Sequence, residues 1–357
     1  MNQKRKWRKV IAIAAVAAMF MIAAGAYALF HEELKIAGSI HLLEGRDDVY
    51  YMEVEGDYHF EEFLKSGGAS SDGGVSAFLT ERISKGFYKM DVTNKGPKCS
   101  VLSARDAKGG HVWGRNFDWD GSVPIIVKCI PKNGYASIST CDFKNITNDP
   151  QEAPDVFWNK MLAIAAVYVP MDGINEKGLC VADLEVNEGG MKEADTQKPD
   201  LTVTTAIRLL LNRAATVDEA VNLLKQYDIH ASAGISHHLA ISDASGESVS
   251  VEFVDGEMVS VDTDCVTNFN LANGDLAAGG ASAKERYERL LDIQEKNKGR
   301  LSSEQLRDAM MQVSKSKGEW RTQWTIVYQQ DTQMAEYFFG GVYEDGVSFS
   351  ILSKSKS

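Results

Sequence analysis

The chain has 357 residues, 44% hydrophobic and 25% charged, which is typical of a globular protein with one large or two small domains. Its formal net charge of −12 argues against nucleic acid as a partner, because phosphate binding needs clustered Lys and Arg. The sequence contains no Walker, GxGxxG or HExxH motif, so it predicts neither a cofactor nor a bound metal.

The N-terminus combines a basic head with a long apolar run. Five Lys and Arg residues stand before residue 10, and the apolar run extends from Val10 to Phe30. Such a run can span a bilayer, and Ala26-Tyr27-Ala28 within it also fits a signal-peptide cleavage site. Residues 1–30 are therefore predicted to be a signal peptide or a membrane anchor, and the length of the run favours the anchor. Both alternatives predict an exported protein, either secreted or anchored on the extracytoplasmic side of the membrane.

Residues 31–98 form a leading segment without recognisable chemistry. The sequence predicts a strand over Val49–Val54, a helix over Phe60–Leu64, a flexible Gly/Ser linker over Ser66–Gly74 and a helix over Ala77–Tyr88. This segment is either a propeptide that covers a site or a permanent accessory piece.

A hairpin is predicted around the Lys-Gly-Gly at 108–110, because β-branched, aromatic and aliphatic residues flank it. If the first two of these residues form the loop, Cys99 faces Asp118 across the ladder, with Arg115 nearby. Arg115 and Asp118 are three residues apart, so a regular strand points them to opposite faces. Both reach Cys99 only if the backbone bends after Gly114.

The remainder of the chain alternates between strand and helix patterns. Apart from a turn at 172–178, the pattern predicts strands over 125–130, 135–141, 179–186, 238–242, 248–253, 261–269, 324–328, 335–339 and 347–352, and helices over 203–228, 283–296 and after Ser302. Strands, then helices, then strands suit an α+β fold in which two antiparallel sheets pack between helical layers.

A lone Cys at the start of a strand is more often a small buried hydrophobe than a nucleophile. Three motifs favour the second interpretation here: Cys99 with Gly-Arg-Asn-Phe-Asp at 114–118, Asp-Gly-Ile-Asn-Glu-Lys-Gly-Leu at 172–179, and Thr-Asn at 267–268. They resemble the choloylglycine hydrolase family of linear amide C–N hydrolases, which includes bile salt hydrolases and penicillin V acylases. The resemblance covers roughly residues 99–357 and implies a four-layer αββα sandwich of the N-terminal-nucleophile (Ntn) type.

The resemblance implies that Cys99 is the nucleophile and that its own α-amine is the base. A free α-amine has a pKa of about 7.7–8.0, which suits proton transfer from a thiol. Cys99 must then be the first residue of the working enzyme, so the Lys98–Cys99 bond has to be cleaved, plausibly by the thiol itself. By the same resemblance, Asp118 orients the new ammonium group and Arg115 favours the thiolate; otherwise the two form an ordinary ion pair.

Three further site residues are implied by the resemblance. Asn268 Nδ2 is expected to be one oxyanion donor, although such an Asn is otherwise often a turn residue. The backbone N–H of Glu185 is expected to be the second donor, and its carboxylate stands where some relatives carry Asn. Arg286 is expected to support the site, with Arg289 as the fallback; the alternative is a solvated helix face.

A Cys–His thiol protease is the main rival enzyme class. Adjacent strand residues face opposite ways, so at most one of His237 and His238 can approach Cys99, and His238 is assigned to the strand core. The other four cysteines, at 129, 141, 180 and 265, fit no zinc motif, and their pairing stays open.

The N-terminal run and the resemblance together imply an exported cysteine Ntn amidohydrolase, and the resemblance implies that it cleaves a small non-peptide linear amide: an N-acyl amino acid, a bile salt or a penicillin-like compound. An acyltransferase on the same fold and a catalytically dead surface binding protein are the alternatives. The oligomeric state stays open, and a homo-oligomer is possible.

Overall fold

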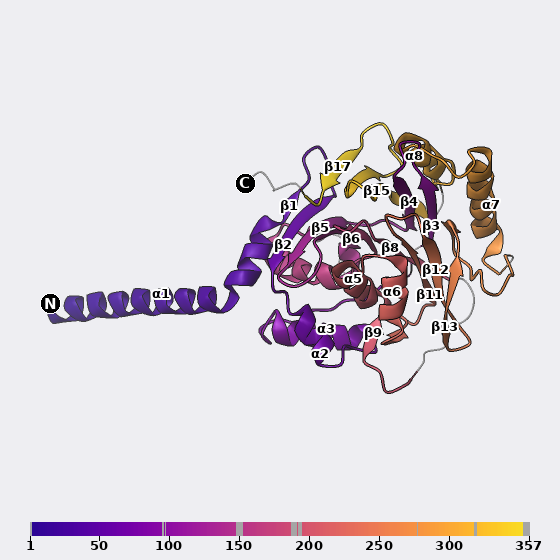
Figure 1. Cartoon of the computed structure of the whole chain (residues 1–357). Helices are drawn as coiled ribbons and strands as arrows, with labels where there is room; N and C mark the ends of the chain where they lie inside the picture. The colour runs from indigo at the N-terminus through magenta and orange to yellow at the C-terminus, as the bar shows by residue number, and fades with distance from the viewer. Residues whose placement is uncertain are drawn as a thin grey trace.

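Two stacked β-sheets with helices on both outer faces form the body of the molecule, and one long helix projects from it (Figure 1). The computed structural model describes residues 2–94, 96, 98–147, 153–186, 191, 195–276, 278–317 and 320–352, with side chains described from residue 6 onward. The described residues include the candidate nucleophile Cys99 and its neighbour Lys98.

The smaller sheet has six antiparallel strands and carries Cys99. Its order is β14-β3-β4-β15-β16-β17, with β3 at Lys98–Arg105, β4 at His111–Trp119, β14 at Cys265–Val266, β15 at Arg321–Gln329, β16 at Met334–Phe339 and β17 at Val347–Ser350. The single strand expected over 261–269 is divided between the two sheets, because β13 ends at Asp262 and β14 begins at Cys265.

The larger sheet has nine strands in the order β1-β2-β5-β6-β7-β8-β11-β12-β13. Their bounds are β1 His41–Leu42, β2 Tyr50–Gly56, β5 Pro124–Pro131, β6 Ser137–Asp142, β7 Asp172–Asn175, β8 Cys180–Glu185, β11 His237–Ser242, β12 Ser248–Val254 and β13 Glu257–Asp262. All neighbours are antiparallel except β2 and β5. Two short strands, β9 (Asp200–Thr202) and β10 (Asp228–His230), pair with each other in parallel.

Alternating side chains of both sheets meet in a buried apolar layer between them. Phe117 and Trp324 stack in this layer with ring centroids 3.7 Å apart, and Cys99 belongs to the same cluster. A second cluster lies between the six-stranded sheet and its helices, and a third lies on the outer face of the nine-stranded sheet. This arrangement confirms the predicted four-layer αββα class.

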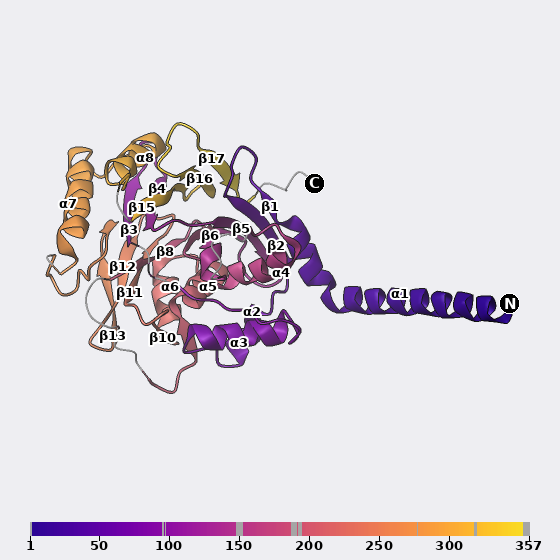
Figure 2. The same ribbon diagram turned by 180° about the vertical axis from the view of Figure 1, so that it is seen from behind.

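Helices α7 (Gly280–Lys296) and α8 (Ser303–Gln312) cover the six-stranded sheet (Figures 1 and 2). The predicted Ser302–Gln305 capping box is present at the start of α8. Close approach of α8 to β4 requires Gly114, because a Cβ there would lie 2.9 Å from Met310 Cγ.

The outer face of the nine-stranded sheet is covered by α4 (Phe157–Ala163), the 3₁₀ helix η2 (Ile164–Tyr168), α5 (Val203–Arg213) and α6 (Val217–Leu224); a further 3₁₀ turn, η1, spans Phe143–Asn145. Arg208 lies in the middle of α5 and is fully buried. Its guanidinium is satisfied by Val167 O at 2.7 Å and by the hydroxyls of Ser137 and Ser139 at 3.0 and 2.8 Å. These bonds offset the cost of burying its charge.

The leading segment is folded against this layer. It contributes β1 and β2 to the sheet edge, and α2 (Phe60–Lys65) and α3 (Asp72–Arg82) outside α5 (Figure 1). The flexible linker expected over Ser66–Gly74 was a wrong prediction, because Gly68 bridges to Asp200 and Ser71 caps α3. Whether 31–98 and 99–357 are distinct units stays a prediction.

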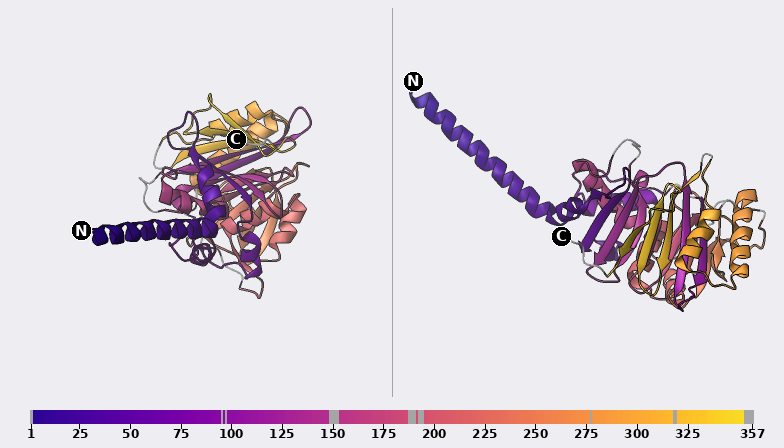
Figure 3. Two further views of the ribbon diagram at one scale, coloured as in Figure 1. Left: turned by 90° about the vertical axis from the view of Figure 1, so that its left-hand side faces the viewer. Right: turned by 90° about the horizontal axis from the view of Figure 1, so that it is seen from above.

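Helix α1 (Asn2–Ser39) projects from the body in every view (Figure 3). Among the described residues, only its stretch Lys6–Ser39 is long and apolar enough to cross a membrane, a property that an N-terminal signal sequence shares. Non-helical torsion angles at Phe30 separate the exposed part from the last turns, where Ile36 and Ala37 are buried.

Candidate active site

Cys99 is the second residue of β3, and its side chain is fully buried in the layer between the sheets. In the ladder it lies opposite Phe117, and Lys98 lies opposite Asp118. The predicted Cys99–Asp118 register is thus wrong by one residue. The residue opposite Gly110 is Asp106 rather than Ala107, and Asp106 N donates to Gly110 O at 2.7 Å.

The Arg115 guanidinium contacts the Cys99 thiol. Arg115 Nη2 donates to Cys99 Sγ at 3.2 Å, and the same guanidinium donates to the carbonyls of Met171 and Asp183, each at 3.0 Å. Asp172 is its buried counterion. Cys99 lies opposite Phe117 in the ladder, and Arg115 precedes Phe117 by two residues in β4. Arg115 and Cys99 therefore project from the same face of the β3–β4 ladder.

Burial raises the pKa of the Cys99 thiol to about 11, although the Arg115 charge acts in the opposite direction. Arg115 therefore lowers the pKa of the thiol, the direction that was predicted, but burial raises this pKa by more. In the uncleaved chain the thiol is protonated at neutral pH, and reaction requires a base.

Asp118 lies on the other face of β4, toward the helices. Its Oδ1 accepts from the Thr322 hydroxyl at 2.6 Å, and its Oδ2 lies 3.7 Å from Arg286 Nη1. Oδ2 makes no hydrogen bond within the described part of the chain. Burial raises the pKa of this carboxyl group against the opposing effects of Arg286 and Thr322.

The bend predicted after Gly114 is absent from the β3–β4 ladder, whose register is unbroken. The irregularity lies instead in the neighbouring strand β15, between Thr322 and Trp324, and turns Thr322 onto Asp118. Arg115 and Asp118 thus approach residue 99 from opposite faces, the first at its sulfur and the second beside its backbone.

Asn268 and Arg286 hold the backbone of Cys99. Asn268 Oδ1 accepts from Cys99 N at 3.1 Å, and Arg286 Nη1 donates to Cys99 O at 2.5 Å. The two side chains are joined by a 2.8 Å bond from Arg286 Nη2 to Asn268 Oδ1. The fallback Arg289 lies away from this group and bonds the exposed Gln312.

Glu185 ends β8 beside these groups. Its carbonyl accepts from Asn268 Nδ2 at 2.7 Å, and its carboxylate pairs with Lys98 Nζ at 2.9 Å. Val186 N bonds Ser236 O in the ladder with β11, so the N–H and C=O of Glu185 point away from that strand because paired residues alternate. The two expected oxyanion donors implied by the resemblance, Asn268 Nδ2 and the Glu185 N–H, therefore lie close together.

All five cysteines are free and buried. In the described part of the chain, no group of three His, Cys, Asp or Glu side chains is arranged to hold a metal ion.

The family model described as linear amide C–N hydrolases, choloylglycine hydrolase family, matches residues 99–268. The match begins at Cys99, the residue around which the buried polar groups gather. Over these residues the chain is similar to the choloylglycine hydrolase family.

Individual relatives extend this comparison. The chain is 36% identical over 98 residues to the penicillin V acylase of Pectobacterium atrosepticum, and the aligned part is 25% of this chain and 26% of that relative, about a quarter of its length. The penicillin V acylase structure of Agrobacterium tumefaciens matches with a TM-score of 0.50 at 17% identity, covering 70% of this chain and 90% of that one. A variant of the conjugated bile acid hydrolase of Clostridium perfringens matches with a TM-score of 0.53 at 18% identity, covering 71% and 92%. These likenesses show the shared fold.

Sequence reasoning missed two carboxylates of the site. Asp172 was read as part of a turn, yet it neutralises Arg115 and accepts bonds from Trp324 Nε1 and Tyr328 Oη at 3.1 and 3.2 Å. The sequence feature that could have identified Asp172 was its place at the start of the Asp-Gly turn that resembles the family's.

The second missed carboxylate is Asp183, which forms a buried ion pair with His237 at 2.8 Å and accepts from Asn94 Nδ2 at 2.6 Å. Neither histidine at 237–238 has a described contact with Cys99. His238 is fully buried in its strand, as predicted, with Glu252 at 3.9 Å.

The His237–Asp183 pair makes the stability of the fold depend on pH. Burial lowers the pKa of His237, but the charge and hydrogen bond of Asp183 outweigh it and raise the value above 6.5. The pair's contribution is complete below about pH 6.5 and is lost as the pH rises through the raised folded-state pKa. Burial raises the pKa of Asp183, but His237 outweighs burial and lowers the value below 3.8. The contribution of Asp183 is therefore complete above about pH 3.8 and is lost as the pH falls through the lower folded-state pKa.

Replacing His237 with Gln is therefore expected to lower the free energy of unfolding by about 1–3 kcal/mol at pH 5–6, and by less at pH 9. Urea unfolding of a Cys99→Ala parent, with and without the substitution, measures this difference at each pH. A difference that does not change between pH 5 and pH 9 would contradict the assigned ion pair.

Proposed function

We propose that the chain is an exported cysteine amidohydrolase of the Ntn type, activated by cleavage of Lys98–Cys99. The observation that carries the proposal is the set of contacts around one residue. Arg115 lies 3.2 Å from the Cys99 sulfur, while Asn268 and Arg286 hold its backbone N–H and C=O. A structural cysteine in an apolar core needs none of these groups.

Maturation begins with attack of Cys99 Sγ on the carbonyl carbon of Lys98. A C–S bond forms, the Lys98–Cys99 C–N bond breaks, and the thiol proton ends on the nitrogen that becomes the α-amine. Water then hydrolyses the thioester, which frees the thiol and leaves a carboxylate on Lys98. Asp118 Oδ2, which makes no described hydrogen bond in the uncleaved chain, is available as a partner for the new ammonium group.

In the cleaved enzyme, the α-amine takes the thiol proton as sulfur attacks the substrate carbonyl. Asn268 Nδ2 and the Glu185 N–H are the proposed donors to the oxyanion, replacing the present bond between Asn268 and the Glu185 carbonyl. The leaving amine takes a proton from the ammonium group, and water then releases the acid from the thioester. Arg115 balances negative charge on sulfur throughout.

The substrate is proposed to be a linear amide outside peptides: an N-acyl amino acid, a conjugated bile salt or a penicillin. This range is supported by the family-model match over residues 99–268 and by the names of the relatives. Helix α1 supports an anchored form on the extracytoplasmic side, since its exposed apolar length follows a basic head.

Intact mass and N-terminal sequencing of the purified protein test the proposal together with a hydrolysis panel. We expect a fragment that begins at Cys99 and turnover of at least one of three probes: an N-acyl amino acid, a conjugated bile salt and penicillin V. Product analysis with an added amine separates hydrolysis from acyl transfer. An active enzyme that keeps Lys98 attached to Cys99 would refute the α-amine base.

Replacing Asn268 with Ala is expected to lower kcat by about 10²–10³-fold, because the oxyanion loses a donor. Asn222→Ala, at an exposed position of α6, is the matched control and should leave kcat unchanged. Steady-state kinetics of cleaved protein checks both variants. An Asn268→Ala enzyme with the kcat of the parent would exclude Asn268 from the oxyanion site.

A further inference from the structure

We propose that the leading segment, residues 31–98, stays bound to residues 99–357 after cleavage. The product is then a two-chain enzyme whose first chain still carries helix α1. This inference rests on the proposed cleavage at Lys98–Cys99. It follows from an interface between the two parts that has the character of a domain core, and cutting one peptide bond at its end leaves that interface intact.

The first part of the interface is a strand. β2 lies between β1 and β5 in the nine-stranded sheet, and its seven residues pair in register from Tyr50 opposite Ile125 to Gly56 opposite Pro131. Met52 and Val54 of β2 are completely buried. Departure of the segment would leave β5 as an unpaired edge with exposed apolar residues, which proteins avoid.

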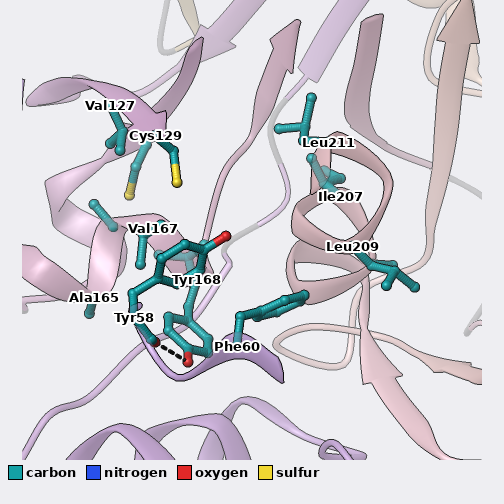
Figure 4. Packing of buried hydrophobic residues seen from close by; sticks show 14 of the residues in the cluster. Tyr58, Phe60, Val127, Cys129, Ala165, Val167, Tyr168, Ile207, Leu209 and Leu211 are labelled. Atoms are coloured by element: carbon teal, nitrogen blue, oxygen red, sulfur yellow. Dashed lines mark hydrogen bonds between the residues drawn. The ribbon is translucent and has the colours of Figure 1, made fainter. Parts of the chain in front are cut away.

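The second part is an aromatic cluster beneath the same sheet (Figure 4). Tyr58 and Phe60 of the leading segment point into a core built by residues of the catalytic part, including Tyr168. Tyr168 Oη donates to Tyr58 O at 2.7 Å, and Asn212 Nδ2 donates to Tyr58 Oη at 2.6 Å. The ring centroids of Phe60 and Tyr168 are 5.6 Å apart.

The third part is the end of the segment, seated on β8 beside the bond to be cut. Asn94 bonds Asp183, and Lys98 pairs with Glu185. Between them Gly96 has φ +71°, and a Cβ there would lie 2.9 Å from Ile235 Cγ2. These contacts seat Asn94, Gly96 and Lys98 against the catalytic part up to the bond to be cut.

The anchor helix is continuous with this interface. Ile36, Ala37 and Ile40 at its end are buried in the same core, and Lys160 Nζ of α4 donates to Ile40 O at 2.7 Å. A retained segment therefore ties the catalytic chain to the membrane by packing after the covalent link is gone.

The test uses the full chain with an affinity tag after residue 357, solubilised in a mild detergent. After cleavage, we expect the tag to recover both chains in equal amounts through gel filtration, and vesicles carrying α1 to retain the tagged chain. Recovery of active 99–357 without the leading segment would overturn the proposal. A single uncut chain would instead count against the proposed function.

A second arm does not depend on self-cleavage. A specific protease site is inserted between Gly86 and Phe87, both exposed, in the Cys99→Ala chain, and the purified protein is cut there. The two pieces should still elute together in buffer and separate only at urea concentrations that unfold the catalytic part. Separation in buffer would overturn the proposal even if the parent never cleaves itself.

Matched substitutions locate the retaining contacts. Phe60→Ala should shift release of the cut piece to lower urea, whereas Phe87→Ala, at a ring that is 72% exposed, should not. If Phe60→Ala prevents folding, Tyr58→Phe removes only the hydroxyl that bonds Asn212 and Cys129, and it should give a smaller shift in the same direction. Equal release midpoints for all variants would show that the aromatic cluster does not retain the segment.

Discussion

Replacing Cys99 with Ala is expected to give a single uncut chain with no amidase activity above background. The substitution removes the sulfur that cuts Lys98–Cys99 and also the sulfur that attacks the substrate, so the loss should be on the order of 10⁴-fold or more. Intact mass measures cleavage, and hydrolysis of the best substrate of the panel measures activity. The chain should still fold, because one buried thiol contributes little to the core.

Cys180→Ala is the matched control. Cys180 is also fully buried and lies in the same cluster between the sheets as Cys99. Its substitution should leave cleavage and activity close to those of the parent, and a thiol reagent should label Cys99 rather than Cys180 in the cleaved enzyme. Equal loss of activity in both variants would mean that packing between the sheets, rather than nucleophilic attack, explains the Cys99 effect.

The hairpin shows what the sequence could and could not predict. The strands and the turn followed from local pattern, and the gathering of polar groups at Cys99 was implied by the family resemblance, but the register followed from neither. Gly109 and Gly110 permit more than one closure, and a shift of one residue exchanges the faces of the strand. The observed closure gives Cys99 the face of Arg115 and leaves Asp118 on the helix side.

The leading segment was the least predictable part of the fold. Its Gly and Ser residues at 66–74 read as a linker, since no local pattern reveals that Gly68 bridges to Asp200 or that Ala69 is buried. Strand β2 was expected, but its parallel partner β5 begins 74 residues after β2 begins. Tertiary pairing of this kind overrides local composition.

The missed carboxylates have the same origin. Asp172 and Arg115 are 57 residues apart, and Asp183 and His237 are 54 apart. Asp172 reaches Arg115 because one sheet packs on the other, and Asp183 reaches His237 because β8 pairs with β11 in the same sheet. The resemblance therefore implied which residues meet at Cys99, but it did not identify Asp172 as the counterion of Arg115 or Asp183 as the partner of His237.

Replacing Asp172 with Asn is expected to destabilise the fold by about 3–5 kcal/mol. The amide keeps the shape of the carboxylate and an acceptor for Trp324 Nε1, but it leaves the fully buried Arg115 without its counterion. Urea unfolding in the Cys99→Ala background measures this loss without interference from cleavage. Asp292→Asn, which removes the exposed ion pair with Lys296, is the control and should cost about 0.5 kcal/mol or less.

A double-variant cycle separates the ion pair from general packing. Arg115→Met combined with Asp172→Asn should be less destabilised than the sum of the two single variants, because the double variant buries no unpaired charge. Strict additivity would mean that Asp172 acts through Trp324 and Tyr328 rather than through Arg115. The charge of Arg115 would then be balanced elsewhere in the site, and its place beside the thiol would need another explanation.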